Sequence, residues 1–256
     1  MQDLRVSIFQ VDQFWEDKKA NYDLYSRLFN EMEDAALVLL PELFNTGFSM
    51  NAKKYAEDWR QSEGIDYLKS WATKKNTAIY TSLMIKEEGN YFNRGVFIFP
   101  NCDISYYNKR KLFTLSGEDQ NYTAGIKECI VSYLGWNINL QICYDLRFPE
   151  LCRNRMIDNH PAYDLLLYVA NWPEKRIEHW STLLKARAIE NQAFVAGANR
   201  IGVDGNSLVY SGNSIAFDST GMEIEFKNLP QEIISYIFCS NSLVEYRKKF
   251  PFLNDK

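Results

Sequence analysis

The stretch Leu140–Glu150, LQICYDLRFPE, places a cysteine where a predicted strand meets a turn. The strand-like run Ile138–Ile142 ends at Cys143, a polar Tyr-Asp-Leu-Arg turn follows, and Pro149 stands where a helix would begin. A strand that delivers a nucleophile into a sharp turn before a helix is a recurrent active-site arrangement. The helix start would supply partial positive charge and free N–H groups, which lower the pKa of a thiol. The segment by itself also fits a small buried cysteine of the core.

Outward from this segment, short apolar runs alternate with helical patterns, which predicts a β/α organisation. The predicted strands are Val6–Val11, Ala36–Leu40, Ala78–Ile85, Tyr91–Phe99, Ile104–Tyr107, Ile130–Leu134, Trp136–Ile142, Leu165–Ala170, Ala193–Ala198, Asn213–Phe217 and Ile233–Phe238. The predicted helices are Lys18–Met32, Ile65–Lys75, Pro149–Asn159, Arg176–Asn191 and Leu243–Phe250. The polar stretch Lys109–Lys127 lacks clear periodicity and is expected to be an active-site loop. Since no repeat or composition break interrupts the chain, residues 1–256 are predicted to form a single domain.

The composition restricts the class of protein. The 256 residues are 46% hydrophobic and 15% aromatic, which is enough for a sizeable core. A net charge of −4 argues against a nucleic-acid or anionic-membrane partner. We expect no membrane span and no signal peptide, because the chain has neither a long apolar run nor a basic, apolar start. The five cysteines are odd in number and form no CxxC pair, which predicts reduced thiols in a cytoplasmic protein.

Histidine is scarce, and this restricts the possible chemistry. The two histidines, His160 and His179, do not stand with cysteines or carboxylates at metal-ligand spacing, so no metal site is predicted. We expect His179 to be structural on a helix and His160 to be solvated in a loop. Few histidines are available to activate a cysteine, so the base for Cys143 is expected to be a carboxylate.

Two further charged residues follow predicted strands. Glu42 comes directly after a buried run and Pro41, and Lys109 begins a basic triplet after Ile104–Tyr107. Taken singly, each also fits a solvated surface residue. Together with Cys143 they meet the needs of amide hydrolysis, which requires a nucleophile, an acid/base and a cation for the oxyanion. Because strand ends at one edge of a parallel sheet converge, we expect the three side chains to meet in one crevice.

With Glu42, Lys109 and Cys143 in this order, the chain resembles the nitrilase superfamily of carbon–nitrogen hydrolases, whose signature is a Glu-Lys-Cys triad in that order. LLPELFNTGF looks like the segment that carries the general base, at Glu42. YYNKRKLF resembles the lysine motif and places that role on Lys109, although Lys111 stands where histidine is commoner. ICYDLRFPE is similar to the nucleophile motif, which places the thiol at Cys143 and an oxyanion-binding N–H at Tyr144.

The resemblance extends over most of the sequence. Glu118, seven residues before Gly125, matches the second glutamate that supports the lysine and the substrate, and the segment from Ala170 to Val195 resembles the next strand and helix. The resemblance implies an α-β-β-α sandwich of two stacked mixed sheets flanked by helices, and a homodimer. It also implies a thioester acyl-enzyme that water hydrolyses, with no metal or organic cofactor. The C-terminal tail Pro251–Lys256 is expected to pack on a neighbouring subunit.

Within this superfamily, PELFNTGFSM is most like the bacterial ω-amidase branch, which deamidates 2-oxo acid monoamides such as 2-oxoglutaramate and 2-oxosuccinamate. Such a substrate needs a cation for its distal carboxylate. Arg147 is the nearest candidate, with Lys111 or Arg110 assisting, and an ion pair of Arg147 with Asp145 or Glu150 is the structural alternative. The expected pocket walls are Phe48, Tyr122 and Trp172, each of which also fits an ordinary core position.

Three alternatives remain at this stage. An N-carbamoyl amine or amino-acid amidohydrolase would release carbon dioxide with ammonia from a ureido substrate. A true nitrilase would act on a nitrile. A catalytically silent binding scaffold would keep the fold without the reaction, but it would have no need to retain Glu42, Lys109, Glu118 and Cys143 together.

Overall fold

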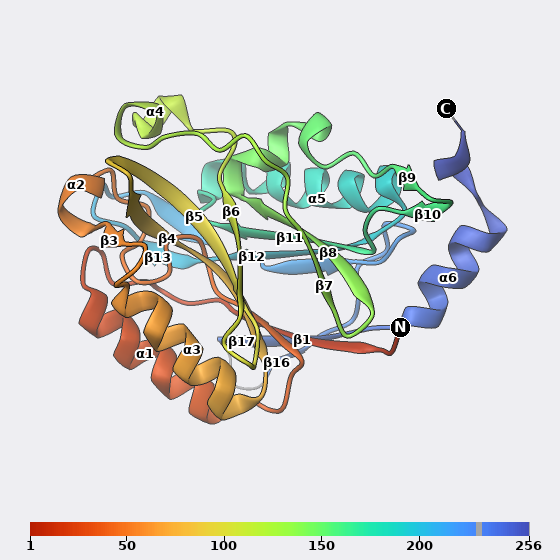
Figure 1. Ribbon diagram of the computed structural model, residues 1–256, viewed down its shortest axis with the longest axis horizontal. Helices are drawn as coiled ribbons and strands as arrows, with labels where there is room; N and C mark the ends of the chain where they lie inside the picture. The colour runs from red at the N-terminus through yellow and green to blue at the C-terminus, as the bar shows by residue number, and fades with distance from the viewer. Residues whose placement is uncertain (229–231, 256) are drawn as a thin grey trace.

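Two β-sheets lie face to face between outer helices in the computed structural model, which describes residues 1–228 and 232–255 (Figure 1). The larger sheet has the strand order β16-β17-β1-β2-β4-β5-β6, with β3 paired to β4. Its strands are β1 (Leu4–Phe9), β2 (Leu37–Leu39), β3 (Glu57–Asp58), β4 (Ala78–Glu87), β5 (Asn90–Ile98), β6 (Ile104–Asn108), β16 (Lys227–Asn228) and β17 (Ile233–Phe238). The smaller sheet has the order β15-β12-β11-β8-β7, made of β7 (Ile130–Tyr133), β8 (Trp136–Ile142), β11 (Leu165–Ala170), β12 (Phe194–Asn199) and β15 (Ile215–Phe217). The predicted sandwich is confirmed.

The helices cover the outer faces of the two sheets (Figure 1). Helices α1 (Lys18–Glu31) and α3 (Glu63–Lys75) lie side by side against the larger sheet, and α5 (Ile177–Asn191) covers the smaller one. The α1 and α3 starts are fixed by side-chain caps, because Asp17 accepts from the Ala20 N–H and Ser62 from the Ile65 N–H. The short helices are α2 (Ala52–Tyr55) and α4 (Glu118–Asn121).

Burial patterns explain why these segments pair as they do. β11 runs parallel to both β8 and β12, and all six of its residues are buried, as expected for a strand covered on both faces. Across the sandwich, the Tyr80 hydroxyl of β4 donates to the Gln141 carbonyl of β8 at 2.9 Å. On the outer face of the smaller sheet, Gly197 admits Trp180 of α5, since a Cβ there would lie 2.5 Å from the indole. These contacts fix the separation of the layers and the position of the strand ends.

The prediction of a helix over Pro149–Asn159 was wrong. The structure has a 3-10 turn at Pro149–Leu151, followed by the short paired strands β9 (Met156–Ile157) and β10 (His160–Pro161). The Asn154 N–H donates to the Asn191 side chain at 2.8 Å, and the Asn154 amide donates to the Asn191 carbonyl at 3.0 Å. These bonds tie the segment to the end of α5, and they replace the helical hydrogen bonds that the sequence pattern suggested.

A second hairpin was not predicted. Strands β13 (Ile201–Val203) and β14 (Val209–Ser211) form a separate antiparallel pair. Its tip is closed by Asp204, whose carboxylate accepts from the backbone N–H groups of Asn206 and Leu208. Strands this short carry almost no alternation pattern, so hydrophobic periodicity does not predict them.

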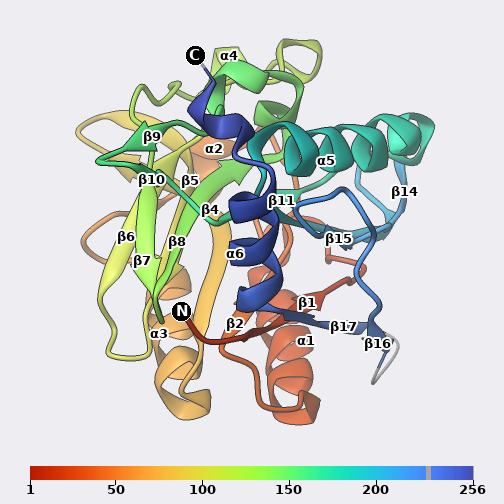
Figure 2. The same ribbon diagram turned by 90° about the vertical axis from the view of Figure 1, so that its right-hand side faces the viewer.

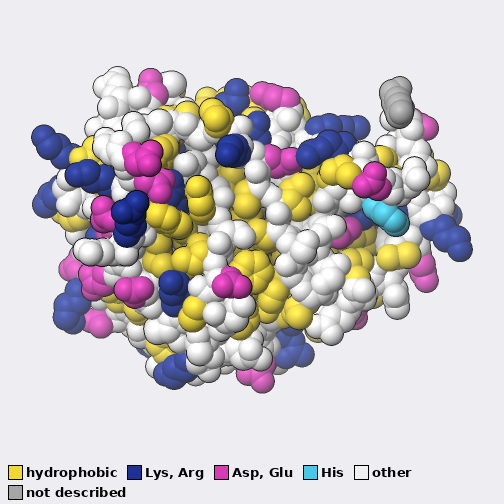
Figure 3. Space-filling view, in the orientation of Figure 1, with side chains coloured by type: hydrophobic (Ala, Val, Ile, Leu, Met, Phe, Trp, Pro, Cys, Tyr) yellow, Lys and Arg dark blue, Asp and Glu magenta, His cyan; other side chains and the backbone are white. Residues whose placement is uncertain are grey.

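The chain ends beside the smaller sheet. Helix α6 (Ser240–Lys249) lies at the edge of the sandwich and leads into the 3-10 turn Phe252–Asn254 (Figure 2). Of the predicted intersubunit tail Pro251–Lys256, Lys256 lies outside the described residues. None of the helices in the described ranges has the length and apolarity that crossing a membrane requires. On the face shown in Figure 3, basic and acidic side chains are interspersed, in keeping with the modest net charge.

Candidate active site

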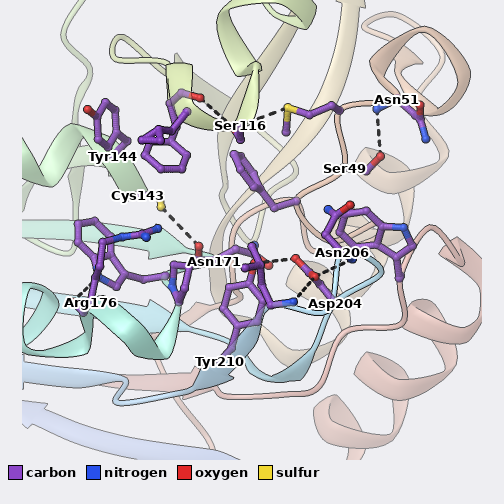
Figure 4. A pocket seen from close by; sticks show the side chains of 18 of the residues that line it. Ser49, Asn51, Ser116, Cys143, Tyr144, Asn171, Arg176, Asp204, Asn206 and Tyr210 are labelled. Carbon is purple, nitrogen blue, oxygen red and sulfur yellow. Dashed lines mark hydrogen bonds between the residues drawn. The ribbon is translucent and has the colours of Figure 1, made fainter.

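A pocket of about 640 Å³ opens where strands of both sheets end, and Cys143 lies in its wall (Figure 4). Its lining comes from segments around residues 15–16, 48–51, 113–116, 143–147, 171–176 and 204–210. Glu42 and Lys109 follow β2 and β6 of the larger sheet, whereas Cys143 follows β8 of the smaller sheet. The expectation that one sheet edge gathers the three residues was therefore wrong, because the crevice lies between two stacked sheets.

Glu42 is fully buried just beyond β2. Its Oε1 accepts from the Asn93 amide at 2.8 Å and from the Lys109 ammonium at 2.9 Å, and its Oε2 accepts from the Asn171 N–H at 2.9 Å. The next residue, Leu43, has a φ of 48°, a left-handed conformation that turns the chain sharply at this point. Every oxygen of the Glu42 carboxylate therefore has a donor, and its orientation is fixed.

Lys109 is 1% exposed and lies between two carboxylates. Its Nζ is 2.9 Å from Glu42 Oε1 and also 2.9 Å from each Glu118 oxygen. Gly125 supports this position, because its N–H donates to the Lys109 carbonyl at 2.8 Å and a Cβ would collide with the Asn108 carbonyl at 2.1 Å. Gly125 therefore stands where its own backbone passes too close to the backbone of Asn108 and Lys109 for a side chain to fit.

Glu118 begins the short helix α4 inside the predicted active-site loop Lys109–Lys127. It is fully buried, and its carboxylate also accepts from the Phe113 N–H at 2.6 Å and the Asn93 amide at 3.1 Å. One carboxylate thus fixes both the lysine and the loop segment that lines the pocket. The expectation that this stretch contributes to the pocket is confirmed by Phe113 and Ser116 in the lining.

Cys143 lies in a strained turn at the end of β8. Its φ is 43°, a value that a residue with a Cβ seldom adopts, and such strain is common at nucleophile turns. The side chain is 8% exposed, and its sulfur lies 3.9 Å from the Asn171 carbonyl, as the dashed line in Figure 4 shows. Tyr144 follows in the first turn of the 3-10 helix Cys143–Arg147, where N–H groups lack intrahelical acceptors.

Asp145 connects this turn to the lysine segment. Its carboxylate accepts from the Ile142 N–H at 3.0 Å, the Lys111 N–H at 2.9 Å and the Tyr107 hydroxyl at 2.9 Å. Burial raises the pKa of Asp145 to about 6, against the opposing effect of the Lys109 ammonium and of these hydrogen bonds. The residue thus fixes the position of the nucleophile relative to the lysine.

Electrostatics in the buried cluster differ from the sequence-based expectation. Burial raises the pKa of the Cys143 thiol well above its ordinary value, and the Glu42 carboxylate adds to this effect more than Lys109 opposes it. Burial alone would lower the pKa of Lys109, but the Glu118 and Glu42 carboxylates raise it well above its ordinary range. Burial also raises the pKa of Glu118. The prediction of a lowered thiol pKa was wrong, because desolvation and two carboxylates outweigh one cation and a turn of helix.

The predicted substrate-binding side chains separate into two groups. Phe48, Arg147 and Trp172 line the pocket. Arg147 stacks 4.7 Å above the Trp172 ring, and its Nη2 lies 3.2 Å from His179 Nδ1, so the alternative ion pair with Asp145 or Glu150 is not formed.

Lys111 and Tyr122 are not in the pocket lining, so both predictions need correction. The Lys111 ammonium turns away toward Glu150 at 3.7 Å and toward the Phe148 ring. Tyr122 is buried behind the wall, where its hydroxyl donates to the Ser49 carbonyl at 2.7 Å. Neither position follows from sequence spacing, because side-chain direction in this loop depends on tertiary contacts.

Two residues that orient Glu42, Asn93 and Asn171, were not predicted from the sequence. Asn93 bridges Glu42 and Glu118, and the Asn171 amide donates to the Glu42 carbonyl at 2.6 Å. Asn171 directly follows the buried strand β11, the same pattern that drew attention to Glu42 and Cys143, so it was within reach of the sequence argument. Within residues 1–228 and 232–255, no group of three or more His, Cys, Asp or Glu side chains is arranged to hold a metal ion.

The structure thus brings Glu42, Lys109 and Glu118 into direct contact and places the Cys143 thiol beside them. This arrangement can supply a nucleophile, a proton acceptor next to the thiol, and a fixed positive charge in a partly dry hollow. The catalytic roles assigned to these residues remain predictions.

Comparisons with known proteins agree with the fold and the motifs. The carbon–nitrogen hydrolase family profile matches residues 5–235. The chain is 39% identical to the ω-amidase YafV of Yersinia enterocolitica, over all of this chain and 97% of that protein. It is 30% identical to the 2-oxoglutaramate amidase of Bacillus subtilis, over 88% of this chain and 86% of that protein.

A solved structure is also closely similar. The protein XC1258 of Xanthomonas campestris, a CN-hydrolase superfamily protein with an arsenic adduct in its active site, superposes with a TM-score of 0.96. It is 39% identical and covers 100% of this chain and 98% of its own. The chain therefore belongs to the carbon–nitrogen hydrolase family of the nitrilase superfamily, a family of hydrolases that act on carbon–nitrogen bonds other than peptide bonds.

Proposed function

We propose that the protein is an ω-amidase, which hydrolyses the terminal amide of short 2-oxo dicarboxylic acid monoamides such as 2-oxoglutaramate and 2-oxosuccinamate. The observation that carries the proposal is the buried Lys109 ammonium, held 2.9 Å from two carboxylates beside the Cys143 thiol. The names of the relatives, an ω-amidase and a 2-oxoglutaramate amidase, support the substrate class.

In the first step, the Cys143 sulfur attacks the amide carbonyl carbon while Glu42 takes the thiol proton. Concerted transfer fits the raised pKa of the Cys143 thiol, because such a thiol loses its proton more readily to a base during the attack than to water before it. The negative charge that develops on the carbonyl oxygen is stabilised by the Lys109 ammonium and the Tyr144 N–H. Glu118 keeps the lysine in place with two 2.9 Å contacts.

In the second step, the carbon–nitrogen bond breaks and Glu42 returns its proton to the leaving nitrogen, which departs as ammonia. The acyl group remains on Cys143 as a thioester. Glu42 then takes a proton from water, the water oxygen attacks the thioester carbon, and the carbon–sulfur bond breaks as the thiol recovers its proton. Cys143 supplies the nucleophile of the first half-reaction, water that of the second, and Glu42 transfers the protons in both.

The cost of burying these charges argues against a silent scaffold. Taking an ammonium and two carboxylates out of water costs several kcal/mol per ion, and apolar side chains of similar size would be at least as stable. A protein that needed only the fold would gain by losing them. The contacts therefore favour a catalytic purpose for Glu42, Lys109 and Glu118.

Ammonia release from 2-oxoglutaramate tests the proposal. Wild type should release it, and Cys143→Ala should lose the reaction because it removes the thiol beside Lys109. The matched control is Cys239→Ala, which removes an exposed thiol and should retain full activity. Similar rates for wild type and Cys143→Ala would reject the mechanism, and carbon dioxide release from a ureido substrate would indicate an N-carbamoyl amidohydrolase instead.

The proposal includes a cytoplasmic homodimer. Five unpaired cysteines support a reducing compartment. The exposed apolar side chains Val244 and Phe252, on α6 and the turn that follows it, support a self-association surface at the C-terminal edge. Sedimentation equilibrium of the full chain would give twice the monomer mass, and a monomer at micromolar concentration would reject the dimer.

A further inference from the structure

The charged side chains of the pocket are divided between two opposite walls. The lining residues of positive charge are Arg147 and Arg176, and those of negative charge are Glu16 and Asp204. Figure 4 shows Arg176 and Asp204 on opposite sides of the cavity. An anionic part of a substrate is therefore attracted to the arginine wall and repelled from the other one.

Arg176 has no assigned role in the reaction described above, and its guanidinium is available. Within residues 1–228 and 232–255, no carboxylate lies within 4.0 Å of the guanidinium of Arg176 or of Arg147. The Arg176 guanidinium rests against the Phe113 ring at 5.4 Å, on the loop that Glu118 fixes. A partly exposed arginine that faces a pocket without an ionic partner is suited to bind an anionic ligand.

The backbone of Arg176 is firmly positioned. Its carbonyl accepts from the Trp172 indole N–H at 2.8 Å, and its N–H donates to the Pro173 carbonyl at 3.0 Å. The same Trp172 ring carries the Arg147 guanidinium, and the Asn199 side chain bonds both backbone groups of Trp172. One buried tryptophan thus positions the Arg147 guanidinium and the backbone of Arg176 in the same wall of the cavity.

We propose that Arg176 is a specificity-determining residue that binds the distal carboxylate of the substrate together with Arg147. The inference rests on the proposed amidase function and adds the residue that recognises the negative charge at the end of the acyl chain remote from the amide. The carbonyl carbon lies at Cys143, and the carboxylate lies between the two guanidinium groups beside Trp172. Neutral amides of the same length lose this contact and depend only on the apolar surface.

Kinetics with paired substrates test the role of Arg176. For Arg176→Gln, kcat/KM on 2-oxoglutaramate should fall about 10- to 100-fold, mainly through KM, since a charged hydrogen bond is lost. Hydrolysis of an uncharged amide of equal chain length should stay unchanged. Arg176→Lys, which keeps the charge but loses the planar fork, should fall between the two. Lys175→Gln, which removes an exposed charge from the neighbouring residue, is the control and should behave as wild type.

Binding of the product 2-oxoglutarate, measured by calorimetry, separates this inference from the proposed function. The dissociation constant should rise for Arg176→Gln and not for Lys175→Gln, whether or not the chain hydrolyses 2-oxoglutaramate. Equal binding by wild type and Arg176→Gln would overturn the inference, as would an equal loss of kcat/KM on charged and neutral amides. Failure of wild type to hydrolyse 2-oxoglutaramate while still binding 2-oxoglutarate through Arg176 would reject only the proposed reaction.

Discussion

Charged side chains are buried and paired at the inner end of the pocket, whereas at its outer end they are partly exposed and have aromatic rings as neighbours. At the inner end, Glu42, Lys109 and Glu118 are buried and each charge meets another at 2.9 Å. At the outer end, Arg147 and Arg176 are partly exposed and rest on aromatic rings. The difference indicates a division of labour, in which paired and dry charges perform the chemistry and unpaired charges select the substrate.

The largest effect is expected at the inner end. Lys109→Met should lower kcat by about 10³-fold, because the developing oxyanion loses its cation. It should also lower the free energy of unfolding by about 3–5 kcal/mol, because two buried carboxylates lose their partner. Lys111→Met is the matched control, since that side chain is partly exposed and turned toward Glu150. Denaturant unfolding and ammonia release of the two variants would contradict this view if they were alike.

Asp145→Asn should produce the next largest effect. The carboxylate accepts three hydrogen bonds that fix the cysteine turn relative to the lysine segment, and an amide cannot accept them all. We expect kcat to fall about 100-fold through misplacement of the nucleophile. Steady-state kinetics would show the loss in kcat rather than in KM, and a change confined to KM would place Asp145 in substrate binding instead.

The same residue predicts a dependence of stability on pH. Burial raises the pKa of Asp145 in the folded protein from 3.8 to about 6, so the folded state binds this proton more tightly than the unfolded state. The stabilising effect is therefore complete below pH 3.8 and is lost as the pH rises through about 6. Relative to Asp145→Asn, wild type should lose roughly 3 kcal/mol over this range. Urea unfolding at several pH values measures the difference, and a constant difference would refute it.

At the outer end, Arg147→Gln should raise KM for 2-oxoglutaramate about 10-fold and leave kcat nearly unchanged, because it removes binding that the ground state and the transition state share. The buried cluster is not disturbed, since Arg147 packs on Trp172 and bonds His179, which lie outside the group formed by Glu42, Lys109 and Glu118. A fall in kcat comparable with that of Lys109→Met would remove the distinction between the two ends.

The smallest effect is expected on the acidic wall. Glu16→Gln should increase kcat/KM for 2-oxoglutaramate by at most about 3-fold, because a partly exposed carboxylate repels the substrate only weakly. The increase should shrink as salt is added, since screening weakens exposed charges. Measurements at low and high ionic strength check this, and a gain that is independent of salt would point to a change of shape instead.

The sequence predicted the inner end better than the outer end, and the reason is physical. Glu42 and Cys143 both lie shortly after buried strands, and the stacking of the two sheets brings these strand ends together. Arg176 directly precedes helix α5, so no periodic pattern indicates where its side chain points. The direction of the Lys111 side chain depends on a tertiary contact with Glu150. The thiol pKa was misjudged because a sequence shows which charges are near but not how much water is removed.

In the fold, too, the elements with a long sequence pattern were predicted and the short ones were not. The long runs of β4, β5 and β11 were found because alternation or continuous burial extends over several residues. The two-residue strands β9 and β10 carry no such pattern, and Pro149 looked like the first residue of a helix. The structure of this segment is determined by tertiary hydrogen bonds that join Asn154 to the end of α5, and the local sequence does not indicate these bonds.

In the proposed reaction the Cys143 sulfur carries the acyl group of the substrate. Intact-protein and peptide mass spectrometry, after rapid acid quench of the enzyme with 2-oxoglutaramate, detects this thioester. We predict a mass increase of one 2-oxoglutaryl group on the peptide that contains Cys143, abolished in Cys143→Ala. Full-rate ammonia release without any acylated peptide, or with the acyl group on another residue, would show that Cys143 is not the nucleophile.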